Sequence, residues 1–185
     1  GGACTIESIS YHNSVSSSSD YINLDELDIY MAVTEKTHFS TQADWTPSNK
    51  LILVYSGKDV LLGDTPWEKI TLDAPFYYNG RGNLVVVVAK KTNQYKSGNK
   101  WYYTKNDLNA NLYYANDGNE NIADNPPTSS DQGVRTTWSA NIILDVVYGE
   151  VESPLVITPN PIDFGYRPSD AWTRPVEVEF STEDL

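Results

Sequence analysis

The residues that could act in nucleophilic catalysis are few and follow no known pattern. The chain has one cysteine, Cys4, and two histidines, His12 and His38. Nucleophilic catalysis needs a nucleophile, a base beside it and a group that orients the base. Neither histidine lies in a recognisable motif, and a lone cysteine near the start of a strand usually packs as a small apolar side chain. We therefore expect no cysteine–histidine catalysis.

Carboxylates offer a second route to chemistry. Asp25, Glu26 and Asp28 form an acidic run, and glycoside hydrolysis uses two carboxyl groups about 5–9.5 Å apart. Carboxylates that alternate along a strand mostly point to water, so we expect this run to be solvated. The chain is predicted not to be an enzyme, and a hydrolase built on the same fold is the weaker alternative.

One loop carries the oxygen donors that calcium prefers. Its turn is permitted by Gly118, and its donors are Asn116, Asp117, Asn119, Glu120 and Asp124. The spacing differs from the EF-hand loop, which needs a glutamate at its last position. Asn and Asp also stabilise turns through side-chain hydrogen bonds to the backbone. We predict no obligate cofactor, with calcium as the one candidate ion.

Aromatic side chains are the most abundant binding groups, with 13 tyrosines and 5 tryptophans. Flat rings on a surface stack on sugar faces, whereas buried rings hold a core together. Trp45 and Trp67 are expected to pack. Rings close to predicted turns are the candidates for ligand binding, together with one guanidinium: Trp101, Trp138, Tyr113, Tyr114 and Arg135.

Charge and composition narrow the range of partners. The formal net charge is -12 and the isoelectric point about 4.4, which disfavours nucleic acid because phosphate recognition depends on Lys and Arg. No apolar run reaches the roughly 20 residues of a membrane span, and no signal peptide is visible. A single cysteine cannot form a disulfide within the chain. Because the opening residues GGAC lack Met, we expect the chain to begin inside a longer precursor, or to be an expression product cut from one.

The elements that must position these residues are predicted to be strands. Apolar residues at period two in 27–33, and short apolar runs bounded by Gly, Pro and Asn elsewhere, predict an all-β fold. We expect an antiparallel β-sandwich, jelly-roll-like. The continuous run Val85–Val88 is typical of a strand buried on both faces, so it is predicted to lie at the centre of the sandwich.

Several motifs follow one another in a fixed order: KTHFS, ADWTPSNKLILVYSG, WEKITLDAPFYYNGRGNL, and the NLYY strand followed by a loop with NPP. Their order resembles a β-sandwich module of secreted and surface proteins of the Bacteroidetes type, found beside fibronectin type III and cleaved-adhesin domains. The resemblance covers residues 4–146. The module usually has an aromatic-rich strand before the position of TIESISY, and this chain starts too late to contain it.

A second, shorter resemblance follows. PLVITPNPIDFGYRPSDAW is similar to the opening of immunoglobulin-like repeats of the abnormal-spindle and hydin type. We therefore predict three parts: a sandwich module at 1–149 that lacks its first strand, a proline-rich linker at 150–161, and the start of an immunoglobulin-like domain at 162–185.

The resemblance implies a non-catalytic module of an extracellular or cell-surface bacterial protein, often delivered by type IX secretion. Adhesion or a spacer role is expected, with a carbohydrate-binding module as the alternative. Expected partners are neighbouring domains of the same protein and a glycan or host-cell protein. The absent first strand predicts an open edge beside Thr5–Tyr11 that a strand from another chain completes.

Overall fold

The computed structural model describes residues 2–14, 22–23, 26–58, 61–62, 65–90, 101–114 and 133–148. The chain divides into two units, Gly1–Tyr148 and Gly149–Leu185. The predicted linker at 150–161 and the predicted second domain at 162–185 lie outside the described residues. The described part of the first unit contains strands and one short 3-10 turn, η2 (Ser48–Lys50), but no α-helix.

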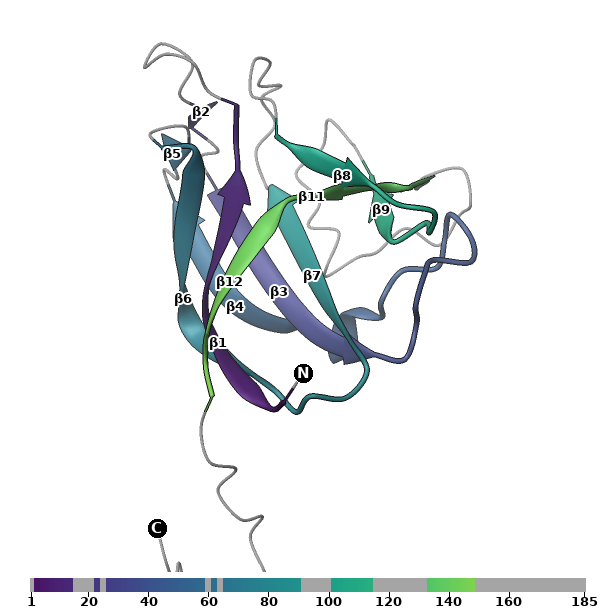
Figure 1. The fold of residues 1–185 in the computed structure, drawn as a ribbon, viewed down its shortest axis with the longest axis horizontal. Helices are drawn as coiled ribbons and strands as arrows, with labels where there is room; N and C mark the ends of the chain where they lie inside the picture. Colours follow the sequence, from purple (N-terminus) through teal and green to yellow (C-terminus); the bar gives the residue numbers. More distant parts are fainter. Residues whose placement is uncertain are drawn as a thin grey trace, which may run out of the picture. The chain divides into compact units, whose positions relative to one another are not determined.

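The first sheet has three antiparallel strands in the order β12-β1-β6. These strands are β1 (Cys4–His12), β6 (Trp67–Tyr78) and β12 (Ile142–Val147), and Figure 1 shows β1 between the other two. Asp145 on β12 ties them together, because it accepts a hydrogen bond from Ser8 Oγ at 2.7 Å and pairs with Lys69 Nζ at 2.5 Å.

Both edges of β1 are therefore occupied. Thr5 pairs with Val147 on one side and with Tyr77 on the other. The expectation of an open edge beside Thr5–Tyr11, to be completed by another chain, was wrong. β12, from the other end of the described unit, pairs along the edge of β1 that was expected to be open.

The second sheet has the order β4-β3-β7, again antiparallel. These strands are β3 (Glu26–Thr34), β4 (Ile52–Lys58) and β7 (Asn83–Lys90). The connection between β6 and β7 uses Gly80 and Gly82 at positive φ, a backbone conformation that glycine adopts without steric cost.

The strand buried on both faces is β3, whereas β7 lies at an edge. Six consecutive residues of β3, Leu27–Ala32, are buried. Within the described residues β7 pairs with β3 alone, and its Val88 is 45% exposed. The prediction that Val85–Val88 forms the centre of the fold was therefore wrong, because a β-branched run fits an edge strand as well as a central one.

Because both faces of β3 are buried, one acidic residue of this strand, Asp28, is buried as well. Asp28 is buried, and it accepts hydrogen bonds from Ser56 Oγ at 2.7 Å and Tyr30 Oη at 3.1 Å. The expectation of solvated carboxylates was wrong for Asp28. Glu26 follows that expectation, because its pairing with Lys58 is exposed, and Asp25 lies outside the described residues.

The two sheets share one apolar core. Its buried members come from both: Ile6, Ile9, Ile70, Leu72 and Phe76 from the first sheet, and Leu27, Ile29, Met31 and Val54 from the second. The prediction of an all-β, antiparallel fold is confirmed. The finer description, a jelly-roll-like sandwich, stays a prediction.

Three two-stranded ladders complete the described unit. β8 (Tyr103–Lys105) pairs with β11 (Trp138–Ala140), and β9 (Asn111–Tyr113) pairs with β10 (Val134–Thr136). β2 (Ile22–Asn23) pairs with β5 (Leu61–Leu62). The β8–β11 ladder joins the first sheet through main-chain bonds from Tyr102 N to His12 O and from His12 N to Asn141 O.

Candidate binding site

A groove of about 560 Å³ runs along β7. All six residues from Asn83 to Val88 line it. Consecutive residues of a strand point to opposite faces, so a groove lined by six in a row follows the edge of the strand, where the main chain is accessible. Its volume falls within the range of about 300–1,000 Å³ that is usual for ligand sites.

The other walls come from segments far away in the sequence. They include Tyr11 at the end of β1, Ile142 at the start of β12, the stretch 110–114, and parts of the loop between β3 and β4. Among the described lining residues there is no Asp or Glu, although the chain carries a net charge of -12. The basic lining residues are Lys36 and His38.

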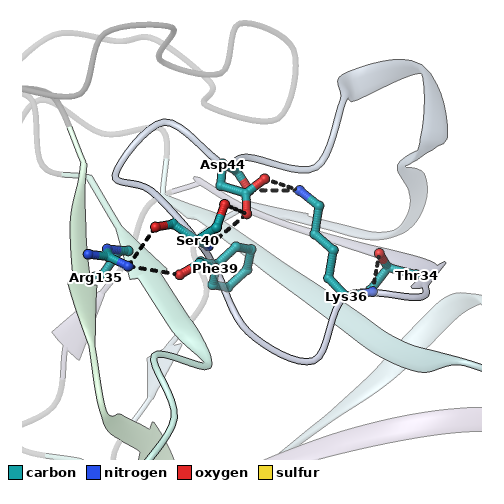
Figure 2. A network of polar contacts seen from close by, with 6 residues as sticks. All are labelled: Thr34, Lys36, Phe39, Ser40, Asp44 and Arg135. Atoms are coloured by element: carbon teal, nitrogen blue, oxygen red, sulfur yellow. Dashed lines mark hydrogen bonds and ion pairs between the residues drawn. The ribbon is translucent and has the colours of Figure 1, made fainter.

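The loop wall, residues 35–46, is held by a polar network that Figure 2 shows from close by. Asp44 is its centre: its carboxylate pairs with Lys36 Nζ and accepts hydrogen bonds from Ser40 N at 2.8 Å and Ser40 Oγ at 2.9 Å. Arg135 Nη1, from β10, donates to the carbonyls of Phe39 at 3.1 Å and Ser40 at 2.8 Å. These bonds join the loop to a strand that lies 95 and 96 residues later in the sequence.

The charge state of Asp44 follows from this network. Burial acts to raise the pKa of its carboxyl, but the hydrogen bonds from Lys36 and Ser40 and the positive charge of Lys36 together outweigh burial, so the pKa is lowered. Asp44 therefore stays ionised at neutral pH and neutralises Lys36. The groove is left with little net charge of its own.

Tight packing holds the loop from a second direction. A Cβ atom at Gly133 would lie 2.4 Å from the carbonyl oxygen of Gln42 and 3.1 Å from Cζ2 of Trp45. Only glycine fits at that distance. Within the described residues two buried donors here, Trp45 Nε1 and Arg135 Nε, have no hydrogen-bond partner, and such atoms cost folding free energy.

A second surface feature is a pair of exposed rings on the β8–β11 ladder. Tyr103 and Trp138 stack with centroids 4.7 Å apart and planes 15° apart. They are 54% and 52% exposed. In the ladder Tyr103 lies opposite Ala140, and Trp138 lies opposite Lys105, so one face of the ladder carries two aromatic rings and an ammonium group.

Other rings are used for structure. The imidazole of His12 stacks between Trp67, with centroids 4.4 Å apart, and Tyr102, with centroids 4.2 Å apart. Trp101 packs against the main core and meets Tyr11 edge to face at 5.9 Å. Burial raises the pKa of the Tyr11 phenol, which keeps this groove residue neutral.

The structure brings some of the predicted site residues to the groove and separates others. Tyr113 and Tyr114 line the groove, with Tyr113 exposed. Trp138 belongs to the exposed pair, Trp101 is partly buried, and Arg135 holds loop carbonyls. Sequence reasoning missed His12, because its ring contacts come from residues far away in the sequence. It also missed Lys36 and Asp44, which lie eight residues apart, because no regular spacing marks an ion pair within an irregular loop. It also missed Tyr103, although the alternation in KWYYTK predicts that one of two adjacent tyrosines faces outward.

The predicted calcium donors Asn116, Asp117, Asn119, Glu120 and Asp124 lie outside the described residues. Within the part of the chain that is described, no three His, Cys, Asp or Glu side chains are placed to hold a metal ion. The calcium site stays a prediction.

Comparisons with protein-family models, with curated proteins and with solved structures found no significant match. The resemblance to Bacteroidetes surface modules and to immunoglobulin-like repeats therefore rests on the motifs alone. In the described residues no helix is long and apolar enough to cross a membrane.

Proposed function

We propose that this chain is a non-catalytic module of a secreted or surface-attached bacterial protein and acts in adhesion, beside neighbouring domains of the same polypeptide. The observation that carries the proposal is the exposed stacked pair Tyr103–Trp138. Exposed aromatic rings are unfavourable in water, and Tyr and Trp dominate the energetics of binding surfaces. A spacer has no use for two such rings side by side.

The ligand class that suits this pair is carbohydrate. Each ring has one face against its partner, which leaves the outer face of each to stack on a sugar ring. Lys105, across from Trp138 in the ladder, supplies a donor for sugar hydroxyls. The polar and flat surface suits a neutral or acidic glycan better than a deep apolar ligand.

A glycan array probed with the full chain tests this function. We expect retention of a restricted set of glycans, and a loss of at least about tenfold in affinity for the double variant Tyr103→Ala/Trp138→Ala. Tyr77→Ala is the matched control, because Tyr77 is 56% exposed on β6 and has no stacked partner among the ring contacts of the described residues.

Two results would contradict the carbohydrate assignment. One is the absence of any retained glycan, which would favour the spacer role. The other is equal retention by the double variant and the wild-type chain, which would move the glycan site away from the ring pair.

A further inference from the structure

Val88 lies on the core-facing side of β7, and the described structure leaves its side chain partly uncovered. Leu84 and Val86 pack against the main core, whereas Val87 packs against a second cluster with Tyr30 and Ala89. Val88 therefore shares the core face with Leu84 and Val86. Its ladder partner Ile29 is fully buried, yet Val88 is 45% exposed and lines the groove.

We infer that the groove along β7 receives an extended apolar peptide segment of another polypeptide, which adds to the edge of β7 as a further strand. An added strand would cover Val88 and also Ile142, a further lining residue that is 40% exposed. This inference goes beyond the carbohydrate proposal, because Tyr103 and Trp138 are not among the residues that line the groove.

The main chain of β7 has the chemistry for strand addition. In an antiparallel pair, every second residue turns its N–H and C=O toward the partner strand, and the residues between them turn theirs away. β7 pairs with β3 in continuous register from Asn83 to Lys90. Every second residue of Asn83–Val88 therefore directs both groups into the groove, over a length of about 20 Å.

The lining selects the side chains of the incoming segment. The β7 wall from Leu84 to Val88 is apolar, the described lining residues include no carboxylate, and Lys36 is neutralised by Asp44. An acidic peptide would meet only His38 as a further basic side chain and would be repelled by the net charge of -12. A segment with branched apolar residues at alternate positions is complementary to the apolar wall. Basic residues at its two ends are complementary to the negative charge of the chain.

A peptide strand is favoured over a glycan because the groove follows a strand edge. Aromatic residues, among them Tyr113 and Tyr114, also line the groove, but its longest continuous wall is the β7 segment of leucine and valines, which offers a main chain and no rings. Backbone groups at regular spacing match another main chain, which is the basis of recognition by strand addition.

The test uses the full chain and the synthetic octapeptide Lys-Thr-Val-Thr-Val-Thr-Val-Lys. We expect saturable binding by calorimetry and slower amide hydrogen exchange in Asn83–Val88. Two further peptides carry N-methyl groups on all valine amides or on all threonine amides. Since alternate amides of an added strand face β7, only one of the two is expected to lose binding, by at least about tenfold.

Val88→Lys is the protein variant for the groove, and it is expected to weaken octapeptide binding at least about tenfold. Val147→Lys is the matched control, because Val147 is 48% exposed on the edge strand β12 and does not line the groove. If Val88→Lys fails to fold, Val88→Thr keeps the shape of valine and replaces one methyl group with a hydroxyl, and it is expected to weaken octapeptide binding in the same direction.

Three outcomes would overturn the inference. The first is no binding of the octapeptide at millimolar concentration. The second is equal binding of both N-methylated peptides, which would indicate apolar contact without strand pairing. The third is displacement of the peptide by cellohexaose with the same exchange protection, which would make the groove a glycan site. None of these three outcomes tests the Tyr103–Trp138 pair. The peptide inference and the carbohydrate proposal can therefore fail independently of each other.

Discussion

The imidazole of His12 lies nearly parallel to the indole of Trp67, with centroids 4.4 Å apart and planes 10° apart. Tyr102 covers the other face of the imidazole. The main chain at His12 also bonds to Asn141 and Tyr102. One residue thus joins the first sheet to the ladder that carries the exposed ring pair.

Replacing His12 with Ala should lower the free energy of unfolding by about 2 kcal/mol, since two ring contacts are lost. His38→Ala is the control, because His38 is exposed and forms a hydrogen bond with the neighbouring Thr37. Urea unfolding followed by tryptophan fluorescence measures both. Equal midpoints for the two variants would show that the stack contributes little.

Replacing Gly133 with Ala should destabilise the unit by about 2 kcal/mol, because the new methyl group would overlap the Gln42 carbonyl. Gly2→Ala, where nothing lies within 4 Å, should leave stability unchanged. Thermal unfolding reports the difference. A Gly133→Ala protein as stable as the wild type would mean that the loop 35–46 yields easily.

Replacing Asp28 with Ala should cost about 3 kcal/mol, because it leaves the hydroxyls of Tyr30 and Ser56 without their acceptor. Asp73→Ala is the matched control: Asp73 is exposed and accepts a hydrogen bond from Ser56 N. Chemical unfolding of both variants, at neutral pH, gives the comparison. A smaller loss for Asp28→Ala than for Asp73→Ala would contradict the burial of this carboxylate.

The lowered pKa of Asp44 predicts that the stability of the unit depends on pH. Its pKa in the folded state is lowered, so its contribution is present above the unfolded value of about 3.9 and is lost as pH falls through the folded pKa. The contribution should be less than about 1 kcal/mol, because the carboxylate is partly solvated. Asp44→Asn should flatten the stability profile in the acid range below the unfolded pKa of about 3.9.

Glu26→Gln is the control for Asp44→Asn, because Glu26 pairs with Lys58 in an exposed contact. The dependence of stability on pH for Glu26→Gln should follow that of the wild-type chain. If Asp44→Asn shows the same acid dependence as the wild-type chain, the network around the loop does not depend on the charge of Asp44.

The fold class could be read from the sequence because strand periodicity is local. Leu27, Ile29 and Met31 alternate, and all three are buried in the core. Gly80 and Gly82 indicate a turn, and in the structure both adopt positive φ in the turn between β6 and β7. The pairing of β1 with β6 breaks between Phe76 and Thr71, a stretch that contains Pro75, and proline cannot donate to a ladder.

The candidate sites depend on pairings that only the tertiary structure decides. Valine runs have the same local pattern at a centre and at an edge, so the position of β7 follows from the pairing of β3 with β4 on one side and with β7 on the other. The same holds for Asp28, whose burial depends on both faces of β3 being covered. Local alternation determines which residues form strands, whereas contacts between residues far apart in the chain determine which edges, rings and charges face the solvent.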